Sequence, residues 1–97
     1  MDIRVVGGNT IEIEGNIKSL EDYGLIKDAS AKVVSEGHTE VVFDILDSMS
    51  MVSSVIGHIL KMINQNKIKV RVNVWDERLY GLLDQLALVQ AFHVTKK

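Results

Sequence analysis

The side chains best placed for chemistry lie between positions 44 and 58 of the chain. Ser53 and Ser54 are adjacent, His58 follows them, and Asp44 and Asp47 precede them. A serine in the first turn of a helix faces unpaired backbone N–H groups and the positive end of the helix dipole. Its hydroxyl can therefore cap the helix or carry a phosphate. We expect Ser53 to be the helix cap and function to be centred on this loop-to-helix junction.

The same side chains are those that a serine hydrolase would use. Helical spacing brings His58 near Ser54, and Asp47 could supply the acid, but the chain has no Gly-x-Ser-x-Gly elbow and specifies no oxyanion hole. His38, His58 and His93 are too dispersed to form a metal signature, and no phosphate-binding glycine motif occurs. We therefore expect no enzymatic activity, no metal and no cofactor.

Length and composition indicate one small domain that binds a protein. The 97 residues, 46% of them hydrophobic, suffice for a single core, so we expect one domain over residues 1–97. The absence of cysteine and of a signal peptide at the N-terminus favours the cytoplasm. A net charge of −2 gives little attraction to nucleic acid, and no apolar run is long enough to insert into a membrane.

Hydropathy patterns predict the elements that must position the junction. Hydrophobic residues that alternate with polar ones indicate strands, and hydrophobic residues that recur every three to four positions indicate helices. Ser19, Gly37 and Asp76 are the residues expected to cap the helices. The predicted order is strands at Ile3–Val5 and Ile11–Ile13 around the Gly7-Gly8 turn, a helix from Ser19 to Glu36, a strand at Val41–Leu46, a helix from Ser53 to Gln65, a strand at Ile68–Val74, a helix from Asp76 to Leu86, and a short strand or extended tail at Ala91–Thr95.

This order is β-β-α-β-α-β-α, which predicts an α/β fold. An N-terminal antiparallel hairpin followed by right-handed crossovers makes a mixed four-stranded sheet, with the helices packed mainly on one face. Parallel strands and their crossover helices place the Ser53 junction at the carboxyl edge of the sheet, the usual position of sites in such folds. Trp75, which follows the strand predicted at Ile68–Val74, belongs to the same edge.

With this order and this junction, the chain resembles the STAS family, the domain of bacterial anti-sigma factor antagonists, over nearly its whole length. In the family an apolar strand and a short loop precede Asp-Ser-Ser/Thr-Gly-Leu-Gly at the start of a helix. Here Val41-Val-Phe-Asp44 matches the strand and Val52-Ser-Ser-Val-Ile-Gly57 matches the helix start. Gly15-Asn-Ile17 and the segment from Asp76 to Leu88 are weaker matches in the same order.

The resemblance implies a regulatory domain that binds a kinase-type anti-sigma factor. In the antagonists this serine kinase phosphorylates the serine that follows the motif aspartate, and the phosphate separates the two proteins. That role falls on Ser53, with Ser54 as the second choice. The implied partner-binding residues surround it and are Met49, Ser50, Met51, Val52, Ser53, Ser54, Ile56 and Trp75.

Three departures from the family pattern keep an alternative open. Val52 replaces the usual aspartate, Val55 replaces the usual glycine, and Lys18 stands where many members carry an acid. The alternative is a non-phosphorylated STAS subunit of an ABC-type lipid-transport complex. Met49 and Met51 fit either a flexible contact surface or packing under the helix, and Trp75 fits either the partner surface or packing on the outer face of the sheet.

Overall fold

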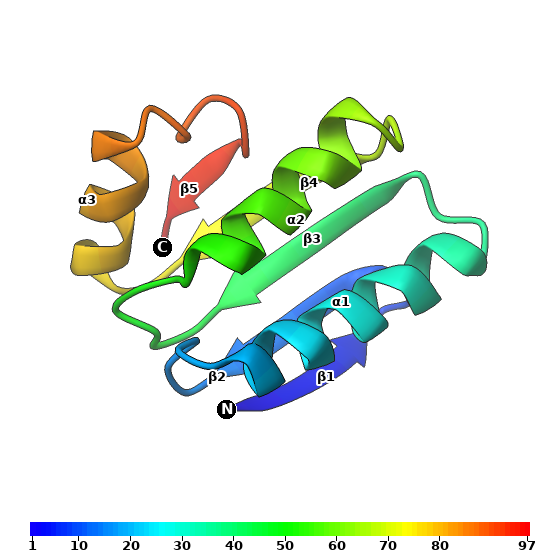
Figure 1. The fold of residues 1–97 in the computed structure, drawn as a ribbon, viewed down its shortest axis with the longest axis horizontal. Coiled ribbons are helices and arrows are strands. Elements are labelled where there is room, and N and C mark those ends of the chain that lie inside the picture. The colour runs from blue at the N-terminus through cyan, green and yellow to red at the C-terminus, as the bar shows by residue number, and fades with distance from the viewer.

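The chain forms an N-terminal hairpin followed by alternating helices and strands. The structure is a computed structural model that describes residues 1–97 (Figure 1). Its elements are β1 (Asp2–Val6), β2 (Thr10–Glu14), α1 (Leu20–Ser35), β3 (Glu40–Ile45), α2 (Ser53–Asn64), β4 (Lys69–Val74), α3 (Glu77–Gln85) and β5 (Val94–Lys96). Every helix and strand predicted from the sequence is present, with boundaries shifted by a few residues.

The sheet is mixed, with strand order β1-β2-β3-β4-β5. β1 pairs antiparallel with β2 across a turn in which Gly7 and Gly8 have φ values of 62° and 87°. These left-handed conformations are easy for glycine, which confirms the predicted hairpin. β2, β3, β4 and β5 pair in parallel. The consecutive order puts the crossover helices on the same face of the sheet.

The prediction of four strands was wrong, because the C-terminal segment adds a fifth strand. β5 pairs in parallel with β4, with Val94 opposite Val72, and the Lys97 N–H donates to the Val74 carbonyl. Phe92, which is fully buried, holds the segment against the core. A strand of three residues has too short an alternation to stand out in a sequence. It forms here because β4 would otherwise expose its backbone groups along an open edge.

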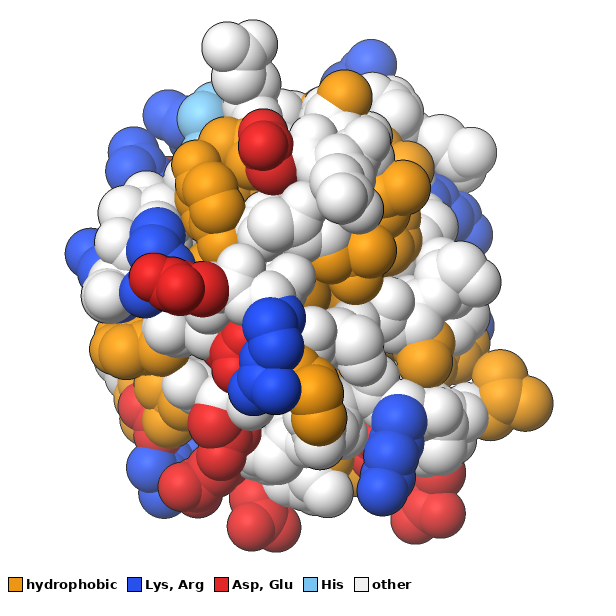
Figure 2. All heavy atoms as spheres, turned by 90° about the vertical axis from the view of Figure 1, so that its left-hand side faces the viewer, with side chains coloured by type: hydrophobic (Ala, Val, Ile, Leu, Met, Phe, Trp, Pro, Cys, Tyr) orange, Lys and Arg blue, Asp and Glu red, His pale blue; other side chains and the backbone are white.

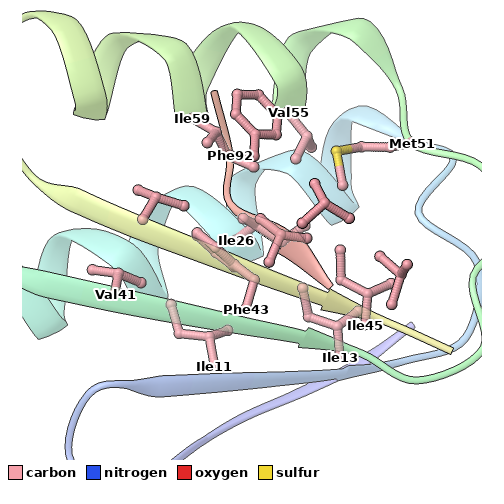
Figure 3. Packing of buried hydrophobic residues seen from close by; sticks show 14 of the residues in the cluster. Ile11, Ile13, Ile26, Val41, Phe43, Ile45, Met51, Val55, Ile59 and Phe92 are labelled. Atoms are coloured by element: carbon pink, nitrogen blue, oxygen red, sulfur yellow. The ribbon is translucent and has the colours of Figure 1, made fainter. Parts of the chain in front are cut away.

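A single hydrophobic core lies between the helices and one face of the sheet. Inward side chains of β2 and β3, such as Ile13 and Phe43, point toward Val55 and Ile59 of α2 (Figure 3). Leu79 and Leu83 of α3 belong to the same cluster. The opposite face of the sheet is uncovered and carries polar side chains, including Glu12, Asp44, Arg71 and Asn73. The fold is therefore a two-layer α/β structure.

Candidate functional site

The carboxyl ends of β2, β3 and β4 lie at one edge of the sheet, which also holds the starts of all three helices. The loops at this edge are Gly15–Ser19, Leu46–Val52 and the short turn at Trp75–Asp76. Figure 2 shows this side of the molecule, where exposed hydrophobic side chains lie in several places and acidic side chains gather toward the lower part of the view. The surface at this edge is therefore formed by the loops and the helix starts rather than by the strands.

Ser48 ties the loop before α2 to the loop before α1. Its side chain is fully buried, and its Oγ accepts a hydrogen bond from the Ile17 N–H at 3.0 Å. The same hydroxyl donates to the Ser50 carbonyl at 2.6 Å. The hydroxyl therefore acts as acceptor for a backbone group of one loop and as donor to a backbone group of the other. Ser48 thus links the loop before α2 to the loop before α1.

Two further side chains join the same loops. The Gly15 N–H donates to Asp47 Oδ1 at 2.6 Å, and the Met49 N–H donates to Asn16 Oδ1 at 3.2 Å. Sequence reasoning missed Ser48 and Asn16 and gave Asp47 only a place in a hydrolase triad. The available signal was the polar pair Asp47-Ser48 directly after the strand predicted at Val41–Leu46, where loop backbone groups need partners.

Ser53 lies at the junction as predicted, but its predicted role as the helix cap was wrong. The residue at the cap position is Val52, with φ −65° and ψ 150°, and no side chain caps α2. Its carbonyl accepts hydrogen bonds from the Val55 and Ile56 N–H groups, so Ser53 is already the first helical residue. From there its hydroxyl does not fold back on the next N–H groups, as a cap must. The Ser53 side chain is exposed.

The other two helices are capped by side chains. Ser19 Oγ accepts from the Asp22 N–H at 3.0 Å, and Asp22 accepts from the N–H groups of Lys18 and Ser19, which completes a capping box. The hydrogen bond from the Lys18 N–H, followed by the Ser19 hydroxyl, lowers the pKa of Asp22 below its usual range although burial opposes the shift.

Asp76 caps α3 in the same way. Its side chain accepts from the Arg78 N–H at 2.7 Å, and the hydrogen bonds from the Arg78 guanidinium lower the pKa of Asp76 to about 2. α2 is therefore the one helix of the three without a side-chain cap, and the N–H groups of Ser53 and Ser54 in its first turn are free to meet an external acceptor.

The predicted partner-binding residues divide into a surface and a buried group. Met49 is 43% exposed and Trp75 is 41% exposed, whereas Met51 is only 5% exposed and points from the loop into the core (Figure 3). Of the two positions that the sequence left open for Met51, the structure shows the one packed under the helix, since a loop that enters a helix over a core needs an apolar anchor. Ser50 and Ser53 are exposed, and Val52, Ser54 and Ile56 are half-buried.

We call the exposed part of this set, together with the half-buried Ile56, the Ser53 corner, which comprises Met49, Ser50, Ser53, Ile56 and Trp75. Trp75 joins it because its N–H donates to the carbonyl of Ile45, the last residue before the Ser53 loop. At the edge predicted from the sequence, Met49 and Ser50 lie in the loop before α2 and Trp75 in the turn after β4, while Ser53 and Ile56 belong to the start of α2 itself.

The side chains of the hydrolase alternative do not assemble. The ring of His58 meets the ring of Tyr23 edge-on, with centroids 6.2 Å apart. Its Nε2 is buried without a partner, and no hydrogen bond joins it to Ser54. Burial, followed by the charges of Lys27 and Lys61, lowers the pKa of His58. No group of three or more histidine, aspartate and glutamate side chains could hold a metal ion.

Two findings concern the chain as a whole. None of the helices combines the length and the apolar character that a membrane span requires. Comparison with known proteins found no matching family model, no similar curated protein and no similar solved structure.

Proposed function

We propose that this chain is a regulatory protein-binding domain, similar to an anti-sigma factor antagonist, that binds a kinase-type anti-sigma factor through the Ser53 corner. The observation that carries the proposal is the exposed Ser53 on the uncapped first turn of α2, held by a loop that hydrogen bonds fix in place.

The fixed loop favours binding because little freedom is lost on docking. Ser48, Asp47 and Asn16 each bond to backbone groups on the neighbouring connection, so the approach to Ser53 is already ordered. A binding surface that is ordered in the free protein saves the entropy cost of ordering it in the complex. The loop thus presents Ser53 to a partner without a conformational change.

The exposed apolar side chains of the corner supply contact area. Met49 and Trp75 are exposed, as are the polar serines Ser50 and Ser53. Tryptophan is enriched among the residues that dominate binding energy, and methionine adapts to the shape of a partner. A surface of this composition fits a protein partner better than a small molecule.

Phosphorylation of Ser53 would act as the switch in this proposal. A phosphate adds a charge of about −1.5 to −2 at the contact surface, and a tenfold loss of affinity needs only about 1.4 kcal/mol. Within the free protein the same phosphate would lie beside the uncapped N–H groups of α2 and the positive end of its dipole. The free, phosphorylated form would therefore be stabilised while the complex is weakened.

Affinity capture tests the proposal, with wild type, Ser53→Asp and Thr39→Asp as baits in lysate of the source cell. Thr39→Asp is the matched control because Thr39 is exposed at the opposite end of β3. We expect wild type and Thr39→Asp to capture a kinase-type protein and Ser53→Asp to lose it. Calorimetry with the purified partner should then show at least a tenfold weaker affinity for Ser53→Asp. Equal affinities for all three baits would rule out the switch and leave constitutive binding.

Trp75 offers a direct readout of where the partner binds. It is the single tryptophan of the chain and belongs to the Ser53 corner. Its fluorescence should change and its quenching by iodide should fall when the partner is added. Unchanged quenching with a bound partner would place the interface elsewhere on the domain.

The runner-up function is that of a non-phosphorylated STAS subunit of an ABC-type lipid-transport complex. Val52 at the cap position favours it, because the aspartate of the phosphorylated pattern is replaced there by a side chain that makes no hydrogen bond. Under this alternative the protein copurifies with an ABC-type ATPase and changes its rate of ATP hydrolysis. An unchanged rate at saturating protein would count against it.

A further inference from the structure

A groove of about 320 Å³ separates α1 from α2 on the helical side of the molecule. The two helices run side by side over the sheet (Figure 1). Lys27 of α1 and Lys61 of α2 line the groove together with the apolar side chains of Val34 and Met62 and the ring of His58. The volume falls at the small end of the range of about 300–1,000 Å³ that is typical of ligand pockets.

The groove is positively charged, with no acid to balance it. None of its lining residues is an aspartate or a glutamate. Neither Lys27 nor Lys61 takes part in an ion pair, since the three ion pairs of the structure use arginines. Two unpaired ammonium groups that line one groove favour an anionic ligand over a neutral or cationic one. The groove therefore matches an anionic ligand in sign.

The ring of His58 lines the groove from α2. Its Nε2 is buried and has no hydrogen-bond partner, which is unusual for a buried polar atom. The groups that face the ring are Tyr23 and Lys27 from α1 and Lys61 from α2, none of which is an acid. The lowered pKa of His58 is the expected response to burial beside these two cations.

We propose that the groove between α1 and α2 binds a phosphate monoester that carries a small apolar or aromatic body. A phosphate monoester has a charge of about −1.5 to −2 at pH 7, which the two lysines balance, whereas a carboxylate would neutralise only one of them. Ala31, Val34 and the methylene groups of the lysines offer the apolar body a surface. The groove contains no residue of the Ser53 corner, so this inference and the proposed function stand or fall separately.

Nuclear magnetic resonance titration with phenyl phosphate tests the site. The expected result is saturable shifts of backbone amides along the facing sides of α1 and α2, and a rise in the ring pKa of His58 as the dianion offsets the lysine charges. His38 and His93 lie outside the groove and serve as internal controls in the same spectrum. Inorganic phosphate should bind more weakly because it lacks an apolar body. Equal affinity for the two probes would contradict the apolar part of the proposal.

Charge-neutral variants complete the test. Lys27→Gln and Lys61→Gln should each weaken phenyl phosphate binding by a factor of about five, the upper range for one partly exposed charge pair. Lys69→Gln is the matched control, because Lys69 is exposed on β4 outside the groove and loses the same charge. Equal weakening by all three variants, equal shifts of all three histidines, or no saturable binding would overturn the proposal.

Discussion

The starts of α1 and α2 lie at the same edge of the sheet and are built in opposite ways. α1 begins at a complete capping box between Ser19 and Asp22. α2 begins after Val52, whose side chain makes no hydrogen bond, and its first helical residue is the exposed Ser53. Helix starts have several backbone N–H groups without a partner inside the helix. In α1 a side chain accepts from one of them, the Asp22 N–H, whereas in α2 no side chain accepts from any.

The difference shows how α2 can do without a cap. Met51 before the helix and Val55 within it are buried in the core, and Ser48 fixes the loop that leads into it. Packing of an apolar face supplies most of the stability of helices in proteins, so a missing cap is tolerated where burial is extensive. The first turn of α2 is thereby left available for contact with a partner.

The largest expected effect comes from breaking the support of the uncapped start. Ser48→Ala leaves the buried Ile17 N–H without its acceptor and should lower the free energy of unfolding by about 2–3 kcal/mol. Ser50→Ala is the control: its side chain is exposed, and its carbonyl, which accepts from Ser48, is retained. Urea unfolding measures both. A loss below about 0.5 kcal/mol for Ser48→Ala would show that the loop is held by other contacts.

Ser19 before α1 and Ser53 at the start of α2 give the most direct test of the difference between the two helix starts. Ser19→Ala removes a cap and should cost about 1 kcal/mol of unfolding free energy. Ser53→Ala removes an exposed hydroxyl that caps nothing and should change it by less than about 0.5 kcal/mol. Urea unfolding of the two variants under one set of conditions checks the difference. Equal losses would mean that Ser53 does act as a cap in solution.

A side-chain cap introduced at the start of α2 should stabilise that helix as the capping box stabilises α1. Val52→Asp places a carboxylate at the cap position and at the positive end of the helix dipole. Because Val52 is half-buried, Val52→Ala measures the lost apolar contact separately. We expect Val52→Asp to be more stable than Val52→Ala by about 1 kcal/mol in thermal or urea unfolding. Equal stability of the two variants would mean that the first turn of α2 cannot accept a cap.

A fall in pH should reduce the stability that the capping box gives to the start of α1. The expected effect is smaller than those above, because only the Asp22 carboxylate titrates. The pKa of Asp22 is lower in the folded protein than its ordinary value of about 3.9. Its ionised form therefore stabilises the fold above that value, and the stabilisation is lost as the pH falls through the lowered folded pKa. The stability difference between wild type and Asp22→Asn, measured by urea unfolding, should shrink between pH 7 and about pH 3. A constant difference would assign the effect of Asp22 to packing.

The predictions that succeeded rest on local signals of sufficient length. The alternation from Ile68 to Val74 and the helical recurrence from Val55 to Ile63 each extend over several residues, and Asp76 and Ser19 carry cap side chains at the correct distance. The prediction for β5 stopped at a choice between a strand and a tail, because only Val94 to Lys96 join the sheet. Its partner, the open edge of β4, lies far away in sequence.

The amino-acid sequence by itself determined the order of elements, the single core and the position of Ser53 at a loop-to-helix junction. Those properties follow from hydrophobic periodicity and cap residues, which act over a few neighbours along the chain. Only the tertiary structure decided that Val52 rather than Ser53 occupies the cap position, that Met49 is exposed while Met51 is buried, and that Ser48 joins two loops. Each of these outcomes depends on which backbone groups and apolar surfaces meet across the fold, and such meetings are set by the packing of distant segments.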